Sequence, residues 1–220
     1  YELKYQSQPP YEVLSTKWIS FQDILVLKDI EEMVEVYYNS LQYGCSIKML
    51  EKLHESPFAF YQSLVSYYKE NGYFHVKHSR VSRCEILLAY YKQMTDVNVD
   101  IFIEALTYDL YARENLKSQP AFVAHQEKWK ECIRDFYASE EMRKKYLPDY
   151  DEYAARQLFH MTHMRFFSIN MSELQQTGSI ILEESFYLFD YKKRDPLSNS
   201  AFIQQIRGEE IAKTNPCEGT

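Results

Sequence analysis

The sequence predicts an α+β fold in which a mainly helical layer packs on a small C-terminal antiparallel sheet of two to three strands. Through most of residues 19–147 apolar side chains recur every three or four positions, the period of amphipathic helices. After residue 151 the apolar segments are rich in aromatic residues and lose that period. The length of 220 residues, with 45% hydrophobic and 26% charged residues, suits a globular protein with one sizeable core.

Residues 1–18 are strand-like and aromatic, and the pair Pro9-Pro10 interrupts them. Proline donates no ladder hydrogen bond and is therefore found at sheet edges and in connectors. We expect this stretch to form an edge strand or an arm. Because the chain opens at Tyr1 without an initiator Met, we also expect it to be the end of a domain that lies upstream.

The first helix is expected to begin after Ser20, a good N-cap residue, with the acidic Asp23 in its first turn. Its apolar stripe predicts a helix that ends near residues 43–44; the stripe consists of Leu27, Ile30, Val34, Tyr37 and Leu41.

Further helices follow the same logic. Ser56-Pro57 predicts a helix start and Asn71-Gly72 its end, because Pro suits the first helical turn and Gly the residue after the last. Ser82 is expected to cap the next helix. The remaining predicted helices cover residues 47–53, 99–115, 129–136 and 139–147.

Two aromatic segments, residues 159–167 and 185–191, are expected to pair as antiparallel strands, with a turn at residues 177–179 between them. The end of the chain, residues 208–220, is expected to be a flexible tail.

Composition excludes several classes of function. With only 5 Gly and no GxGxxG or GxxxxGK pattern, the chain lacks the loops that cradle nucleotide phosphates. A net charge of −7 with interleaved basic residues argues against a nucleic-acid partner, and no apolar run is long enough to predict a membrane span. The four cysteines are dispersed, so we expect Cys84 and Cys132 to pack in the core and the protein to be cytoplasmic.

Few residues suggest chemistry. The pairs His75/His78 and His160/His163 have a spacing that could serve a metal on a helix, but neither has a Cys nearby and neither matches HExxH. The second pair lies where we expect a strand, on which a spacing of three separates the two side chains. We therefore predict no metal-binding residue. We expect the carboxylates to lie on the solvated faces of helices. We expect Asp109 and Arg113, four residues apart, to form a pair on a helix surface.

The aromatic surplus allows two interpretations. Six aromatic residues fall within sixteen positions, more than one helix face can hide: Phe58, Phe60, Tyr61, Tyr67, Tyr68 and Tyr73. They could form a core of large rings with hydroxyls at its edge, or a docking surface, since Tyr is enriched at interfaces. We favour the core.

Three segments resemble the C-terminal region of cobalamin-binding-type radical SAM proteins. The first comprises residues 9–14 (Pro-Pro-Tyr-Glu-Val-Leu), Trp18-Ile19-Ser20 and the helix at residues 29–40. The second, residues 188–197, ends a strand in Phe189-Asp190-Tyr191 and continues into a turn with Arg194-Asp195-Pro196. A weaker third match covers residues 108–114. The resemblance spans nearly the whole chain.

The resemblance implies a non-catalytic C-terminal accessory domain, of unknown function in that family, which caps a radical SAM barrel and helps to position substrate or partner. The missing upstream part of the same polypeptide, a barrel and a cobalamin-binding domain, would cleave S-adenosylmethionine at a [4Fe–4S] cluster. The resemblance leaves open whether cobalamin is also used. The chain itself lacks the CxxxCxxC cluster loop, so we expect it to hold no cofactor and no catalytic residue.

The implied organisation is a connector or last barrel strand at residues 1–18, an accessory domain at 19–207 (helical 19–147, β-containing 148–207) and the tail. Asp190, Arg194 and Asp195 are the candidates for a domain interface or a substrate-facing surface. Their alternative role, which we favour, is to build the turn, since Asp side chains bind nearby backbone N–H groups. The alternative function for the whole chain is an independent helical interaction module that uses its aromatic-rich face.

Overall fold

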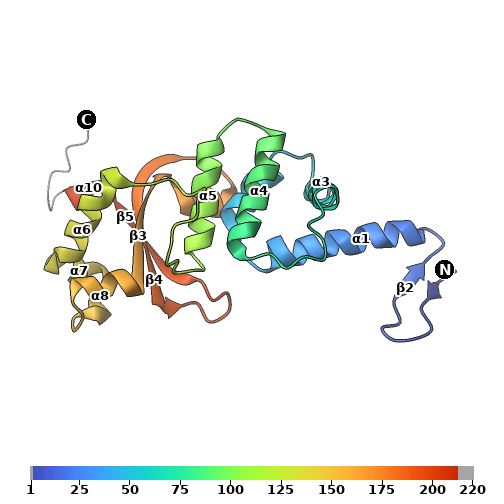
Figure 1. Cartoon of the computed structure of the whole chain (residues 1–220), viewed down its shortest axis with the longest axis horizontal. Coiled ribbons are helices and arrows are strands. Elements are labelled where there is room, and N and C mark those ends of the chain that lie inside the picture. The colour runs from blue at the N-terminus through green and yellow to red at the C-terminus, as the bar shows by residue number, and fades with distance from the viewer. Residues whose placement is uncertain (1, 213–220) are drawn as a thin grey trace.

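A three-stranded antiparallel sheet lies between two groups of helices (Figure 1). The computed structural model describes residues 2–212. The α-helices are α1 (Phe21–Val34), α2 (Gly44–Glu51), α3 (Pro57–Glu70), α4 (Arg80–Met94), α5 (Val99–Tyr111), α6 (Lys130–Ala138), α7 (Glu140–Tyr146), α8 (Ala155–Met161), α9 (Met171–Thr177) and α10 (Gly208–Ala212). A π-helical segment, η1 (Glu35–Asn39), continues α1, and two short 3₁₀ turns are η2 (Glu127–Trp129) and η3 (Pro148–Tyr150). The α+β class is as predicted.

The sheet has the order β3-β4-β5, from β3 (Thr162–Ile169), β4 (Leu182–Arg194) and β5 (Ala201–Arg207). The two predicted strands do pair antiparallel, with Phe166 opposite Phe186. Since side chains alternate across a strand, one face of β4 presents Tyr187 and Phe189 and the other presents Phe186 and Leu188. All four side chains are buried, so both faces of this central strand are covered.

The larger core lies between α1–α5, α9 and one face of the sheet. Its aromatic members settle the question of the tyrosine-rich α3: Phe60, Tyr61, Tyr67 and Tyr68 are all buried. Of the six aromatic residues in that stretch, Phe58 is exposed. The prediction that these rings build a core is therefore confirmed. Figure 1 shows α5 between α4 and the sheet.

The smaller core lies on the other face of the sheet, under α6, α7, α8 and α10. It is built around Phe136, Leu158, Leu188 and Ile206, which are almost completely buried. The tail prediction fails for residues 208–212, which form α10, because Ile211 packs into this core. Residues 213–220 lie outside the described part of the chain.

Helix boundaries follow the capping rules in most places. The Ser20 hydroxyl accepts from the backbone N–H of Asp23, and the Asp23 carboxylate accepts from the Ser20 N–H. Ser56 caps α3 as predicted. The prediction for α4 is wrong by one turn, because Ser79 is the N-cap and its hydroxyl accepts from the N–H of Ser82.

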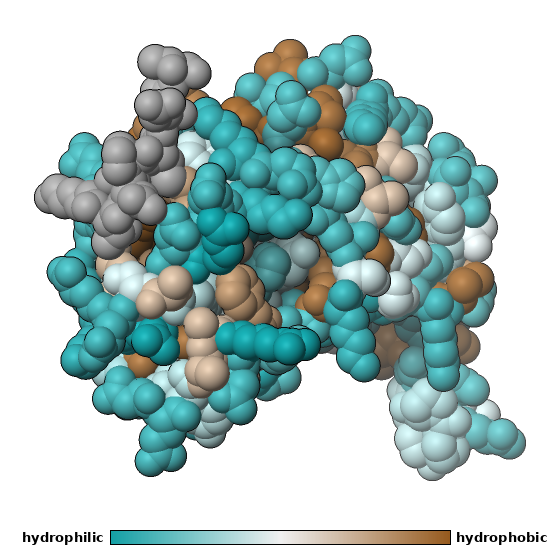
Figure 2. All heavy atoms as spheres, turned by 60° about the vertical axis from the view of Figure 1, so that its left-hand side comes forward, coloured by the Kyte–Doolittle hydropathy of each residue, from teal (hydrophilic) through white to brown (hydrophobic). Residues whose placement is uncertain are grey.

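Residues 2–18 form an arm. Strands β1 (Lys4–Tyr5) and β2 (Val13–Ser15) pair only with each other within residues 2–212, and they stand beyond the N-terminal end of α1 (Figure 1). An ion pair between Glu12 and Lys28 ties the arm to α1. The space-filling view shows the arm protruding from the lower right of the body (Figure 2). An arm outside the main sheet is what the proline pair predicted.

Cysteines and apolar helices complete the description. Cys84 and Cys132 are buried, as predicted, and Cys45 is buried as well. Within residues 2–212 no helix combines the length and the apolar composition that a membrane crossing requires.

Candidate functional site

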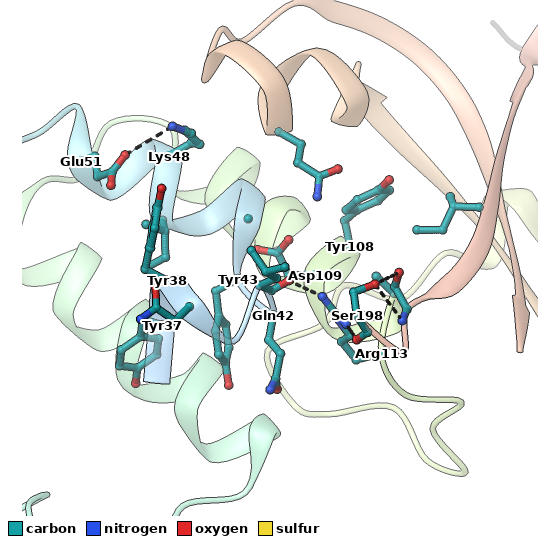
Figure 3. Close-up of a pocket in the computed structure, with 18 residues that line it drawn as sticks. Tyr37, Tyr38, Gln42, Tyr43, Lys48, Glu51, Tyr108, Asp109, Arg113 and Ser198 are labelled. Carbon is teal, nitrogen blue, oxygen red and sulfur yellow. Dashed lines mark hydrogen bonds and ion pairs between the residues drawn. The ribbon is translucent and has the colours of Figure 1, made fainter. Parts of the chain in front are cut away.

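A cavity of about 570 Å³ opens between the larger helical group and the edge of the sheet (Figure 3). We call it the α5 cleft, because the last turns of α5 form its floor. One wall comes from η1 and α2, and the other from β5 and the loop of residues 195–200. The cleft is lined by Tyr37, Tyr38, Asn39, Leu41, Gln42, Tyr43, Gly44, Ile47, Lys48, Glu51, Tyr108, Asp109, Ala112, Arg113, Gln175, Ser198, Ser200 and Ile203.

Asp109 is a buried carboxylate on the floor of the cleft, only 3% exposed. It accepts the backbone N–H groups of Cys45 and Ser46, at 3.0 and 2.9 Å, and the Ser46 hydroxyl at 2.7 Å. Asp109 thereby satisfies the first N–H groups of α2, where a negative charge is favourable. Burial nevertheless raises the pKa of Asp109 to about 6, with the bonds from Ser46 and Cys45 opposing that rise.

Arg113 lies one helical turn beyond Asp109, between it and Ser198 (Figure 3). Its guanidinium donates to the carbonyl oxygens of Leu41 and Ser198, so it connects the two walls of the cleft. The predicted surface pair of Asp109 with Arg113 is therefore wrong. Asp109 is turned to the interior by the packing of α5 on α2, and each side chain has backbone partners instead.

The wall at η1 has an unusual backbone. A π-helical turn leads into Leu41, which has a positive φ of 55° and is 61% exposed. A branched residue in this left-handed region is strained, and both π-turns and strained residues concentrate at functional sites. The strain is held in place because the Leu41 carbonyl accepts from Arg113. On the inner side of the same turn, the hydroxyls of Tyr37 and Tyr68 are hydrogen-bonded to each other.

Of the three predicted site residues, Asp190 is 1% exposed and lies inside the protein. Its carboxylate accepts from the Tyr150 hydroxyl and from the backbone N–H groups of Lys192 and Lys193, at 3.0 and 3.3 Å. These bonds shape a bulge in β4, where the pairing register shifts between Asp190 and Arg194. Its contacts are therefore those of a residue that builds the turn.

Arg194 and Asp195 lie at a second hollow of about 640 Å³, which shares Tyr108, Gln175 and Ile203 with the α5 cleft. The Arg194 guanidinium donates to the carbonyl oxygens of Arg113 and Asn199, at 3.2 and 2.7 Å. Both residues thus contribute to a hollow that continues the cleft.

Asp195 organises the loop of residues 195–200. Its carboxylate accepts from the backbone N–H groups of Leu197 and Ser198, at 3.1 and 2.6 Å, and these bonds lower its pKa. This is the local bonding that the Asp-Pro turn predicted. The loop in turn supplies Ser198 and Ser200 to the α5 cleft.

The two histidine pairs do not converge on a common site. His78 donates from Nε2 to the Tyr73 carbonyl oxygen, and His163 stacks on Tyr111 with ring centroids 4.0 Å apart. His160 lies in α8, whereas His163 lies in β3. Within residues 2–212 no three His, Cys, Asp or Glu side chains are grouped closely enough to hold a metal ion.

The α5 cleft was not predicted from the sequence, although one signal was present. Asp109 occupies the apolar face of α5, three residues after Leu106 and seven after Phe102, both of which are completely buried. A carboxylate on that face is either paired or functional. The partners in α2 lie more than sixty residues away and have no sequence signature.

Comparison with known proteins identifies the family of this chain. A family model described as "Protein of unknown function (DUF4080)" matches residues 1–189 of this chain. A search of the curated proteins and a search of the solved structures each found no match.

Proposed function

The chain belongs to this family, the proteins of unknown function DUF4080, and on that premise we propose that it is the accessory domain of a radical SAM enzyme of the cobalamin-binding type. In this role the chain does not carry out the reaction. It docks on a catalytic barrel of the same polypeptide and turns the α5 cleft toward the substrate or partner. The barrel would cleave S-adenosylmethionine at a [4Fe–4S] cluster, the chemistry that the sequence resemblance implies.

The observation that carries the proposal is the apolar surface of the arm and the first turns of α1. Tyr5 and Tyr11 are each 62% exposed and Trp18 is 69% exposed. The other exposed apolar residues of this surface are Leu3, Val13, Ile19, Phe21, Leu25 and Leu27. An apolar surface of this kind marks an interaction site, and the residues that carry the family resemblance at positions 9–20 lie within it.

The arm also suits a covalently connected partner. Strands β1 and β2 pair only with each other within the described residues, so each has a free edge to which a neighbouring strand can add. We therefore place the barrel against the arm and α1. The α5 cleft lies beyond the other end of α1, at η1.

The alternative, an independent interaction module with an aromatic face, has less support. The aromatic residues of α3 that would form this face are mostly buried in the larger core. The exposed aromatic surface is in the arm instead, at Tyr5, Tyr11 and Trp18.

The test uses the complete protein, expressed from the whole reading frame and purified without oxygen. We expect a CxxxCxxC motif upstream of Tyr1, bound iron and sulfide, and cleavage of S-adenosylmethionine. The double variant Tyr5→Ser/Tyr11→Ser should lower turnover while the melting temperature of this domain stays the same, since both side chains are exposed. Val97→Ser, which changes an apolar side chain of similar exposure (67%) in the α4–α5 loop, is the matched control.

Two results would count against the proposal. A complete protein without the cluster motif and without iron has no radical SAM activity for this domain to assist. Equal turnover of the arm variant, the control and the wild type would show that the arm is not the docking surface.

A further inference from the structure

Arg113 is a partly buried cation whose bonds go only to neutral oxygens. Two of its five N–H donors reach the carbonyl oxygens of Leu41 and Ser198, and the other three have no acceptor within residues 2–212. None of the ion pairs in this part of the chain includes Arg113. Charges removed from water are normally paired, so a cation in this situation at a cavity points to an anion that comes from outside.

The other charged groups on the α5 cleft are already engaged. Asp109 receives three hydrogen bonds from α2, and Glu51 lies 3.7 Å from Lys48. Close to Arg113, Arg80 pairs with Glu114 and Arg194 binds two carbonyl oxygens. Of the two cations that line the cleft, Lys48 and Arg113, only Lys48 has an ionic partner within residues 2–212.

Charged groups of both signs surround Arg113, and two of them are cations. Burial lowers the pKa of Arg113, as do the nearby charges of Arg80 and Arg194, while Asp109 and Asp195 oppose this effect. A bound anion would relieve both the desolvation and the repulsion between these guanidinium groups. The fork of an arginine also matches the two oxygens of a carboxylate.

The remainder of the cleft suits an apolar, ring-bearing body. Tyrosine side chains and the aliphatic Ile47, Ala112 and Ile203 line its walls, and its volume of about 570 Å³ is in the range of small-molecule sites. Figure 3 shows the two parts together, with Arg113 at one side of the cavity and Tyr37 and Tyr38 at the other.

We propose that the α5 cleft binds a small organic carboxylate with an aromatic or aliphatic body, whose carboxylate group is held by Arg113. This site makes the positioning role proposed above more specific. Only the identification of the natural ligand as the substrate of the attached enzyme rests on that proposed role. Carboxylate binding depends on residues of this chain alone. The binding proposal can therefore fail while the docking proposal holds, and the docking proposal can fail while the binding proposal holds.

The experiment compares three probes of one shape on the 220-residue chain: 3-phenylpropionate, the neutral 3-phenylpropionamide and the cationic 3-phenylpropylammonium. Dissociation constants are measured by ligand-observed NMR titration at pH 7.5 and low salt. We expect the carboxylate to bind about tenfold or more tightly than the amide, the ammonium to bind most weakly, and the preference to shrink as salt is added.

Variants locate the binding site. Arg113→Gln should abolish the preference for the carboxylate, and Arg113→Lys should retain part of it, because Lys keeps the charge but not the fork. Arg134→Gln, a change at an exposed arginine paired with Glu131, is the control and should bind as the wild type does. Melting curves establish that each variant is folded, and the comparison of probes on the wild type does not depend on them.

The proposal is overturned if the carboxylate fails to bind at up to about 10 mM, or binds no better than the amide. In either case the role of Arg113 is only structural: it connects the loops that contain Leu41 and Ser198 through its two hydrogen bonds. Equal loss of the preference in Arg134→Gln would place the probe elsewhere on the surface, and this too would overturn the site.

Discussion

The carboxylate of Asp109 accepts both the backbone N–H and the hydroxyl of Ser46, at 2.9 and 2.7 Å, and so joins α5 to the start of α2. This contact fixes the floor of the α5 cleft against one of its walls. It also places an ionisable group in the core of the protein. Its proton affinity should therefore be visible in the stability of the whole fold.

The first prediction concerns Asp109→Asn. Burial raises the folded pKa of Asp109 from its ordinary 3.8 to about 6, so the folded protein holds this proton more tightly than the unfolded chain. The resulting stability is fully present below about pH 4 and is lost as the pH rises through about 6. The substitution should cost about 1–3 kcal/mol, because an amide nitrogen cannot accept the α2 N–H groups.

The measurement is urea unfolding of both proteins at several pH values. The difference in free energy of unfolding between wild type and Asp109→Asn should be larger at pH 4.5 than at pH 7.5. A difference that does not change with pH would mean that Asp109 titrates as an ordinary carboxylate does.

The second prediction concerns His163, which responds to pH in the opposite sense. Its Nε2 is buried and has no hydrogen-bond partner within residues 2–212, and burial, with a smaller contribution from Arg165, lowers its pKa to about 3. Because the unfolded chain takes up this proton near pH 6.5, the stability that neutral His163 provides is complete above pH 6.5 and is lost as the pH falls toward 3.

His163→Phe should therefore remove part of the acid sensitivity. The new ring can keep the stack on Tyr111 and has no nitrogen to protonate. Between pH 7.5 and pH 4.5 the free energy of unfolding of the wild type should fall by about 1–3 kcal/mol more than that of the variant. Parallel loss of stability in both proteins over this range would contradict a buried, neutral His163.

The third prediction tests the bulge in β4 through Tyr150→Phe. The Tyr150 hydroxyl donates to the carboxylate of Asp190, which is 1% exposed. Removing one donor from a buried carboxylate should cost about 1–3 kcal/mol in free energy of unfolding, whereas the apolar contacts of the ring remain. Tyr153→Phe is the control, since the Tyr153 hydroxyl makes no hydrogen bond within residues 2–212 and its ring contacts that of Tyr150. Chemical unfolding at pH 7.5 compares them, and equal costs for both variants would remove the special role of the Asp190 bond.

The order of the main helices and the pairing of two strands could be predicted because their signals are local. Ser20 and Ser56 are helix caps within a few residues of the turns that they satisfy, and the aromatic runs of β3 and β4 lack the helical period. The position of the third strand, β5, was not predicted, because Gln204 and Gln205 interrupt its apolar pattern. Both glutamines have partners that no local pattern reveals: the Tyr146 carbonyl for Gln204, and Ser185 for Gln205.

The candidate site was less predictable for the same reason. Its floor residues lie in α5 and directly after it, but the groups that give them their properties come from distant segments. Asp109 is buried by α2, and Arg113 is held by Leu41 and by Ser198, which are 72 and 85 residues away. The sequence grouped Asp190 with Arg194 and Asp195 as candidates for a domain interface or a substrate-facing surface, or as residues that build the turn. The alternation of β4 turns Asp190 inward instead, where Tyr150 meets it.

The last prediction compares Arg194→Ala with Leu106→Ala. As a charged residue in a turn, Arg194 would be expected to contribute within about 0.5 kcal/mol to stability. The structure changes this expectation, because its guanidinium binds the Arg113 and Asn199 carbonyls and so holds the β4–β5 turn to the C-terminal end of α5. Cations at that end of a helix are favourable, so we expect a cost of about 1–2 kcal/mol.

Leu106 is completely buried in the larger core, and its truncation leaves a cavity that should cost about 2–5 kcal/mol. Thermal melts and urea unfolding of the isolated chain rank the two variants. Under the proposed radical SAM role, Arg194→Ala in the complete protein should also lower turnover more than its stability loss explains, because Arg194 lines the hollow that continues the α5 cleft. Unchanged stability in Arg194→Ala would show that its carbonyl bonds contribute nothing net to the fold. Unchanged turnover of the Arg194→Ala protein would show that Arg194 only stabilises the fold.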